Sequence, residues 1–332
     1  MLDGKTVLVT GGTGSFGKKF TQVALNRFKL RKLIIFSRDE LKQMEMRQAF
    51  PDTGNSPMRY FIGDVRDRDR LYRALDGVDI VVHAAALKQV PTAEYNPIEA
   101  VKTNILGASN LIDAAIDRNV QKVVALSTDK AVNPVNLYGA TKLCADKLFV
   151  AANSYSGHHK TRFSVVRYGN VVGSRGSVVP RFIELRKTGR IPITDPRMTR
   201  FWITLEQAAE FVLDSFSRME GGEIFVPKIP SMKITDLARA IAPECKTEIV
   251  GIRSGEKLHE VMVAEDDARN TREYDRYFVI FPQFHEWGAL RQEGGTPCGD
   301  NFKYSSDGNT EWLSEDMLRS MLGLVAETVE SC

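Results

Sequence analysis

The 332-residue sequence predicts an α/β fold, a doubly wound parallel sheet with helices on both faces and a second, smaller domain. Short apolar runs alternate with amphipathic segments through the first half of the chain. A glycine-rich turn joins the first apolar run to the first amphipathic segment. After residue 168 the alternation breaks down, and the chain is longer than a single hydrophobic core usually supports, so a carboxyl-terminal domain is expected.

The expected domain boundaries follow this alternation. Residues 1–168 and 204–229 are assigned to a nucleotide-binding domain, because a helical pattern at Leu205–Arg218 and a short strand after it return to the sheet. Residues 169–203 and 230–332 are assigned to a smaller substrate-binding domain.

The composition argues against several kinds of partner. With a net charge of +3 the chain is too weakly basic for a nucleic-acid-binding protein, so no DNA or RNA partner is expected. The four cysteines form no C-x-x-C pair, which favours reduced thiols in a cytoplasm over disulfides or zinc. His158 and His159 lack helical ligand spacing, so no metal site is expected. No basic and apolar leader precedes the first strand, and every apolar run falls well short of the ~20 residues that span a bilayer, so a cytoplasmic protein without a membrane anchor is predicted.

The glycine-rich turn predicts a dinucleotide-binding site. Strand residues Thr6–Thr10 lead into it, and Lys18–Phe28 follow with helical spacing. Gly11 permits the tight turn, Gly14 lets the backbone approach a pyrophosphate, and Gly17 allows close packing of the helix on the strand. The order of strand, turn and helix makes the motif specific. The candidate cofactor residues here are Gly11, Thr13, Gly14, Ser15, Phe16 and Gly17.

The residues after the second strand, Lys32–Phe36, favour NADP as the cofactor. A free ribose 2′-hydroxyl prefers an acidic partner here, whereas a 2′-phosphate needs a hydroxyl and a cation, which Ser37 and Arg38 supply. Asp39 would favour NAD if it faced the ribose, but it can equally cap a helix that extends to Ala49. The candidate residues are Ser37, Arg38, Asp39, Glu40, Leu41 and Lys42.

Two further strands are expected to end at the same edge. The third, Arg59–Ile62, ends near Asp64, the usual place for a side chain beside an adenine, and the fourth, Asp79–Val82, leads into alanines that let the backbone lie against a cofactor. Lys88 follows, and its position favours contact with an anionic or sugar ligand over simple solvation. The candidate residues are Asp64, Val65, Ala84, Ala86, Lys88 and, from a long helix expected at Asn96–Ala115, Asn104.

The chemistry is expected where the fifth strand, Val123–Leu126, ends, because open α/β sheets bind ligands at the carboxyl ends of their strands. A hydroxyl, an acid and an amine follow in Thr128-Asp129-Lys130. Tyr138 and Lys142 stand four residues apart in a helical segment, so they share one face, and we expect the ammonium to lower the pKa of the tyrosine. Either group alone is more often a turn or a solvated helix face, but the glycine turn favours a catalytic site.

Beyond this site the elements are shorter. Phe163–Tyr168 is expected to be a sixth strand that closes the parallel sheet, and residues 169–180 are expected to form a loop. The segment 252–260 holds more charged and imidazole groups than a turn needs, although a solvated helix start is an alternative.

The glycine turn and the Tyr138-x-x-x-Lys142 pair resemble the extended short-chain dehydrogenase/reductase family, over nearly the whole chain. Three segments are similar to those of nucleotide-sugar 4,6-dehydratases: 128–130, 167–171 and 253–260. Three more are similar to the inverting members of that group, which act on UDP-N-acetylglucosamine and begin pseudaminic acid synthesis: 37–40, 85–88 and 198–202. In retaining members a glutamate follows the acid, so Lys130 in that place implies inversion at carbon 5 of the sugar.

The resemblance implies a cycle of oxidation, elimination and reduction that returns NADP unchanged. Tyr138, supported by Lys142, would take the proton of the carbon 4 hydroxyl, whose oxygen Thr128 would hold. Lys130 would remove the carbon 5 proton, and Asp129 would protonate the leaving carbon 6 hydroxyl. Lys130 must be neutral for this, so either burial and Lys142 outweigh the neighbouring carboxylate or Asp129 is itself protonated. The implied substrate-binding residues are Lys88, Lys130, Asn170, Val171, Ser174, Arg175, Val178, Thr194, Arg253 and Glu256.

The resemblance also implies a homo-oligomer, a hexamer built from dimers. Two other functions stay open. A nucleotide-sugar 4-epimerase would use Tyr138 and Lys142 but not the Asp129-Lys130 pair. A regulator that binds NADP without chemistry would need the glycine turn but not Tyr138.

Overall fold

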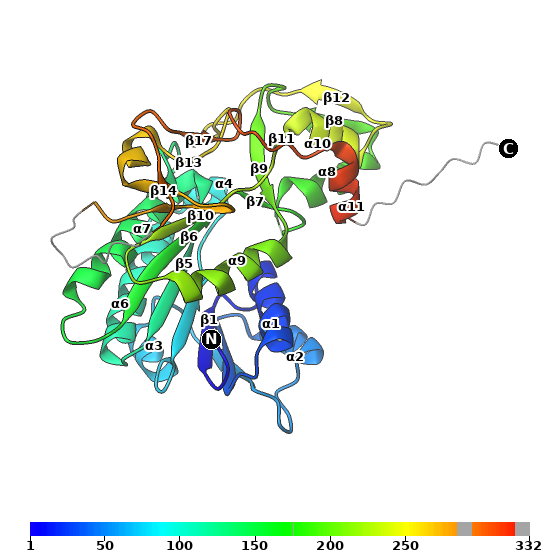
Figure 1. Cartoon of the computed structure of the whole chain (residues 1–332). Helices are drawn as coiled ribbons and strands as arrows, with labels where there is room; N and C mark the ends of the chain where they lie inside the picture. Colours follow the sequence, from blue (N-terminus) through cyan, green and yellow to red (C-terminus); the bar gives the residue numbers. More distant parts are fainter. Residues whose placement is uncertain (175, 284–293, 323–332) are drawn as a thin grey trace.

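The computed structural model describes residues 1–174, 176–283 and 294–322. It has two lobes, a large sheet flanked by helices and a smaller lobe of short strands and helices beyond one edge of it (Figure 1). The predicted α/β fold with a large, mainly parallel sheet is confirmed.

In the described part of the chain the large sheet has ten strands: β1 (Thr6–Thr10), β2 (Lys32–Ser37), β3 (Met58–Ile62), β4 (Ile80–His83), β5 (Lys122–Thr128), β6 (Arg162–Tyr168), β10 (Ile224–Pro227), β14 (Thr271–Glu273), β15 (Tyr277–Ile280) and β16 (Thr296–Pro297). Their order is β16-β14-β15-β10-β6-β5-β4-β1-β2-β3. Neighbours from β3 to β10 are parallel, and β15, β14 and β16 are antiparallel additions. The expectation that the sixth strand closes the sheet is wrong, because β10 pairs with it at Ile224 opposite Val165.

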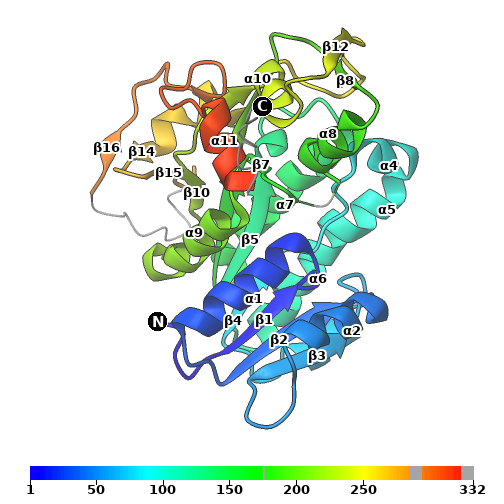
Figure 2. The same cartoon turned by 90° about the vertical axis from the view of Figure 1, so that its right-hand side faces the viewer.

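Helices cover both faces of this sheet. They are α1 (Ser15–Arg27), α2 (Glu40–Ala49), α3 (Arg68–Ala74), α4 (Val90–Tyr95), α5 (Pro97–Val101), α6 (Gly107–Asp117), α7 (Leu137–Tyr155) and α9 (Leu205–Arg218). Helices α1 and α9 lie side by side on one face (Figure 2), and α3, α6 and α7 lie on the other (Figure 1). The return helix α9 has the bounds expected from the sequence, and a reciprocal capping box between Thr204 and Gln207 fixes its start.

The core lies between the sheet and these helices. Strand β1 is buried throughout, as expected for a parallel strand that is covered on both faces. Phe20 of α1, Phe149 of α7 and Phe216 of α9 are fully buried. Each such side chain contributes about 1.5–3 kcal/mol relative to exposure, so the strand ends that carry the polar residues are held by a rigid framework.

The smaller lobe contains β7 (Asn170–Val171), α8 (Val178–Arg186), β8 (Arg190–Ile193), β9 (Thr199–Ile203), β11 (Ser231–Lys233), α10 (Ile234–Ile241), β12 (Lys246–Ile249), β13 (Val261–Val263), β17 (Tyr304–Ser305) and α11 (Glu315–Leu322). It has its own core around Phe182, Trp202 and Leu237. The domain boundaries stay a prediction, but β14, β15 and β16 come from within 230–332 and pair with the large sheet.

The long helix expected at Asn96–Ala115 is present as a continuous helical run of α5, a π-helical turn at Lys102–Leu106 and α6. One local expectation needs correction. Residues 169–180, expected as a loop, contain β7 and the start of α8. Among the helices of the described residues, none has both the length and the apolar character to cross a membrane.

Candidate active site

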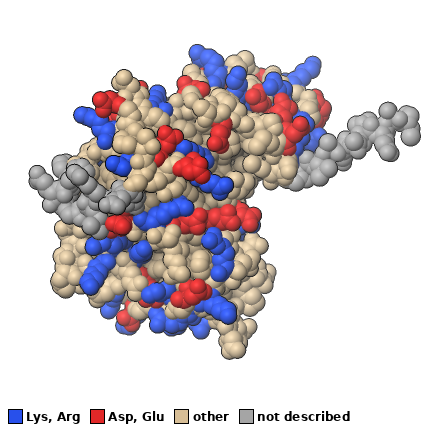
Figure 3. Space-filling view, viewed as in Figure 1, with Lys and Arg blue, Asp and Glu red and all other residues tan. Residues whose placement is uncertain are grey.

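One large cavity of about 940 Å³ lies between the lobes, over the carboxyl ends of the parallel strands. It takes in the glycine turn, the ends of β2, β4 and β5, the start of α7, and the β7 and 253–260 segments of the small lobe. Charged side chains of both signs are interspersed on the face seen in Figure 3, with neither sign covering it alone. Most of the residues chosen from the sequence line this cavity.

Four of those residues do not line the cavity. Glu40 and Leu41 are exposed on α2, because that helix leaves the strand end with its first turn facing outward. Asn104 is buried in the π-helix, where it bonds both backbone groups of Leu87 and the Thr141 hydroxyl. Asp129 is fully buried. Arg175 lies outside the described residues.

The glycine turn has the conformation that a diphosphate site needs. Gly11 has φ +63°, and a Cβ there would lie 2.9 Å from the backbone of Ala85. A Cβ on Gly17 would lie 2.2 Å from the Gly12 carbonyl oxygen, so the close approach is to the turn itself rather than to the strand. Gly14 is the N-cap of α1 and no side chain caps the helix, which begins at Ser15, earlier than expected. The helix amino end is therefore open toward the cavity, as anion binding requires.

The end of β2 combines a hydroxyl with two cations. The Ser37 and Thr13 hydroxyl oxygens are 2.9 Å apart. Asp39 is the N-cap of α2, accepting from the Lys42 backbone at 3.0 Å, and its carboxylate lies 2.6 Å from Lys42 Nζ. The hydrogen bond from Lys42 lowers the pKa of Asp39. The structure thus confirms the capping alternative, while the exposed Arg38 lies 3.3 Å from Asp64.

Tyr138 and Lys142 both line the cavity, on the first turns of α7. The expectation that Lys142 lowers the tyrosine pKa is wrong. Lys142 Nζ donates to the Leu126 carbonyl at 2.7 Å, and burial raises the pKa of Tyr138 to about 12. The main cation that opposes this rise is Lys130. Burial also lowers the pKa of Lys142, with Asp146 opposing.

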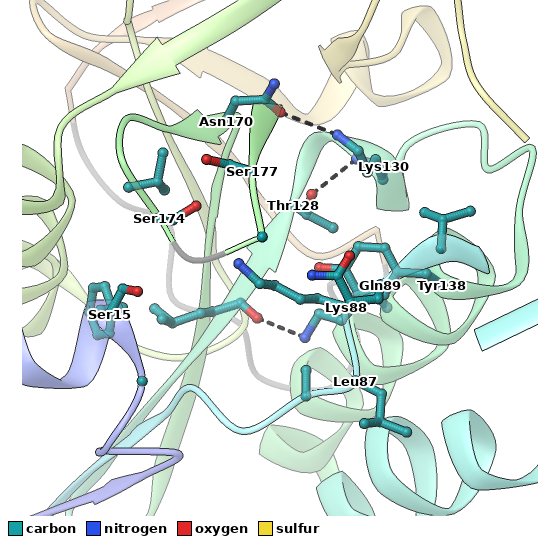
Figure 4. Close-up of a pocket in the computed structure, with 18 of the residues that line it drawn as sticks. Ser15, Leu87, Lys88, Gln89, Thr128, Lys130, Tyr138, Asn170, Ser174 and Ser177 are labelled. Carbon is teal, nitrogen blue, oxygen red and sulfur yellow. Dashed lines mark hydrogen bonds between the residues drawn. The ribbon is translucent and has the colours of Figure 1, made fainter. Parts of the chain in front are cut away.

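Lys130 lies between two carboxylates. Its Nζ is 3.1 Å from Asp129 Oδ1, 3.2 Å from Glu260 Oε1 and 3.4 Å from the Asn170 amide oxygen, the last contact being drawn in Figure 4. The Thr128 hydroxyl donates to Asp129 and accepts from the Lys130 backbone, which fixes the short 3₁₀ turn at Asp129–Ala131.

The pKa values of Asp129 and Lys130 are both raised, but for different reasons. Burial raises the pKa of Asp129, and the charge of Lys130 offsets only part of this. Burial lowers the pKa of Lys130, but Asp129 and Glu260 raise it by more, so its net direction is upward. In the free site Lys130 is therefore an ammonium, and Asp129 is the carboxyl group that is readiest to take its proton.

Comparison with known proteins identifies the family. The family model described as "Polysaccharide biosynthesis protein" matches residues 7–282. The chain belongs to this family. It is 57% identical over 332 residues, 97% of this chain and 98% of the relative, to "UDP-N-acetylglucosamine 4,6-dehydratase (inverting)" of Campylobacter jejuni subsp. jejuni serotype O:23/36.

Two further likenesses extend the comparison. The chain is 44% identical over 288 residues to a "UDP-glucose 4-epimerase" of Rickettsia canadensis, covering 83% of this chain and 82% of that one. The X-ray structure of Pen from Bacillus thuringiensis superposes with a TM-score of 0.88 at 36% identity, covering 98% of this chain and 99% of that one. The resemblance to the extended short-chain dehydrogenase/reductases is confirmed.

The sequence reasoning missed several residues of the cavity lining. Arg200 and Glu260 lie inside segments that were singled out, but neither was chosen as a site residue. Gln89, Tyr168 and Arg181 also line the cavity. The charge density of 252–260 was the available signal for Glu260, and the segments 198–202 and 167–171 were the signals for Arg200 and Tyr168. No local pattern indicates Gln89 or Arg181.

Proposed function

We propose that the protein is an NADP-dependent UDP-N-acetylglucosamine 4,6-dehydratase that inverts carbon 5 and so makes the first intermediate of pseudaminic acid synthesis. The observation that carries this proposal is the contact of Lys130 with Asp129 at 3.1 Å, in the same cavity wall as Tyr138. The relative that is 57% identical bears the name of this activity. A cytoplasmic homo-oligomer built from dimers, up to a hexamer, is part of the proposal.

The residues at the glycine turn and at the end of β2 fit a dinucleotide. The open amino end of α1 would hold the diphosphate, and Ser37 and Arg38, with Lys42 beside them, would hold a 2′-phosphate. Because the Asp39 carboxylate is bonded to Lys42, it would not meet a ribose hydroxyl alone, and this supports NADP over NAD. When bound, the cofactor supplies the hydride acceptor for carbon 4 and the hydride donor for carbon 6.

Tyr138 is the proposed acceptor of the carbon 4 hydroxyl proton. With a pKa of about 12, only a small fraction of this phenol is ionised at neutral pH in the free site. The Lys130 ammonium favours the phenolate, so Tyr138 acts most readily while Lys130 is charged. Oxidation at carbon 4 therefore takes place while Lys130 is an ammonium.

One proton transfer then prepares the elimination. When Lys130 passes a proton to Asp129, an N–H bond breaks and an O–H bond forms, so the ion pair becomes an amine and a carboxylic acid. The amine can remove the carbon 5 proton, and the acid can protonate the leaving carbon 6 hydroxyl. Complete burial of Asp129 favours this neutral pair, which supports the second of the two alternatives left open by the sequence.

A 4-epimerase is the second candidate, because the Rickettsia relative carries that name. Epimerisation would have no use for the buried Asp129–Lys130 pair. Incubation with UDP-N-acetylglucosamine and no added cofactor separates the two, because only dehydration lowers the product mass by one water. Proton NMR of the product gives the carbon 5 configuration. An unchanged mass with an inverted carbon 4 would replace the proposal by the epimerase.

A further inference from the structure

Glu260 is a buried carboxylate without a task in the proposed cycle. It is 2% exposed, yet it lines the cavity at the end of the segment 252–260. Its Oε1 lies 3.2 Å from Lys130 Nζ. Lys130 thus faces two carboxylates at nearly equal distance, and the elimination described above uses only Asp129.

The main chain of Glu260 is held from a distant part of the sequence. Its backbone N–H donates to the Ser306 hydroxyl at 2.9 Å, and the Ser306 N–H donates to the Glu260 carbonyl at 2.8 Å. The Ser306 hydroxyl lies 2.7 Å from that of Thr199 on β9. These contacts use no atom of the Glu260 side chain, so the carboxylate is not needed to hold this segment and can interact with the groups that line the cavity.

The side chain is surrounded by cations. Lys257 Nζ is 3.6 Å from Oε2 and Arg200 Nε is 3.8 Å from Oε1, in addition to Lys130. Oε2 accepts no hydrogen bond from any described residue. Burial raises the pKa of Glu260, but the three cations lower it by more, so the group is a carboxylate. A carboxylate that served only to hold the small lobe together would not need to lie 3.2 Å from Lys130, so this contact points to a role in the site.

We propose that Glu260 is a positioning residue that holds the Lys130 ammonium beside Asp129 and sets the pH range over which the Asp129–Lys130 pair keeps its proton. The groups that face Lys130 are Asp129 from its own turn, Glu260, Arg200 from β9 and the Tyr138 phenol from α7, with Lys88 and Lys257 close by. Glu260 favours the ammonium, whereas Arg200 opposes it. The catalytic part of this inference rests on the proposed function, but the coupling of Glu260 to Lys130 does not.

The coupling is tested without turnover by trace acetylation of the purified holoenzyme. Only the neutral amine reacts, so the labelling rate of Lys130, read by peptide mass spectrometry at pH 8, reports its neutral fraction. A charge at this distance typically shifts a pKa by one unit or more, so Glu260→Gln should label Lys130 about tenfold faster or more. Glu260→Asp, which withdraws the carboxylate by one methylene, should give a smaller increase. The exposed Glu265→Gln is the matched control and should label like the wild type.

The catalytic consequence appears in the pH profile. In the proposed cycle the Asp129–Lys130 pair must keep one proton, so kcat falls when Lys130 loses its proton to solvent at high pH. In Glu260→Gln this alkaline fall of kcat should move about one unit or more toward acid, with little change in KM. A purely structural role would lower kcat and thermal stability without moving the profile. Lys130 labelling equal to that of the control variant overturns the proposal. If Glu260→Gln fails to fold, the proposal is overturned when Lys130 in Glu260→Asp is labelled at the wild-type rate. If the wild type forms no 4-keto-6-deoxy sugar, the proposed function fails, and the labelling result still decides the role of Glu260.

Discussion

Replacing Lys130 by alanine removes the cation that lies between two buried carboxylates. At 3.1 and 3.2 Å, each attraction is about 5 kcal/mol before desolvation is counted, with an effective dielectric constant of about 20. Breaking a buried pair costs about 3–5 kcal/mol, and we expect the lower end, because Asp129 can take up a proton and the lysine side chain is 26% exposed. The variant should therefore fold, with a reduced melting temperature.

The same substitution should stop elimination while cofactor binding remains, because the glycine turn is untouched. Loss of a positioned base typically costs 10²- to 10⁴-fold, so dehydration should fall by at least about 100-fold. Product mass measures dehydration, and the absorbance of reduced nicotinamide shows whether oxidation at carbon 4 still occurs. Lys147→Ala, an exposed lysine on α7, is the matched control.

Heavy water adds a second observable to this experiment. The wild type should place deuterium at carbon 5, because an amine exchanges its protons with solvent, and should carry hydrogen from carbon 4 to carbon 6. Dehydration by Lys130→Ala within about tenfold of the wild type, or retention at carbon 5 in the wild-type product, would refute the reasoning and point to another base.

Three further substitutions test the cofactor and substrate contacts. Arg38→Ala should weaken NADP binding about tenfold or more and NAD binding little, because a charge-assisted contact to the 2′-phosphate is lost; equal loss in titrations of both cofactors would make Arg38 structural. Arg253→Ala should raise KM for the nucleotide sugar about tenfold with a smaller effect on kcat, and unchanged KM would remove that segment from the site. Gly17→Ala should lower stability by about 1–3 kcal/mol and weaken the dinucleotide, since its Cβ would lie 2.2 Å from the Gly12 carbonyl oxygen. Gly299→Ala, with nothing within 4 Å, is its control, and equal melting temperatures for the two variants would contradict the packing argument.

Local pattern was sufficient for most of the large sheet and for the site's location. β1, α9 and the start of α7 follow from apolar spacing and turn residues, and parallel strands place their carboxyl ends at one edge. The same reasoning located the Thr128-Asp129-Lys130 turn and the Tyr138–Lys142 pair. It could not find the antiparallel strands β14 to β16. Those short elements are specified by pairing, β15 with β10, β14 with β15 and β16 with β14, rather than by their own sequence.

The sequence by itself determined the glycine turn, the Thr128-Asp129-Lys130 turn and the Tyr138–Lys142 pair, and the tertiary structure decided which further side chains join them and in which direction their pKa values shift. Lys142 is four residues from Tyr138, yet it bonds the Leu126 carbonyl, and the cation that acts on the phenol is Lys130. Glu260 follows Lys130 by 130 positions and lies 3.2 Å from it. A pKa depends on burial and on every charge within a few ångströms, and those distances are set by packing between segments far apart in the chain, so spacing along the sequence cannot supply them.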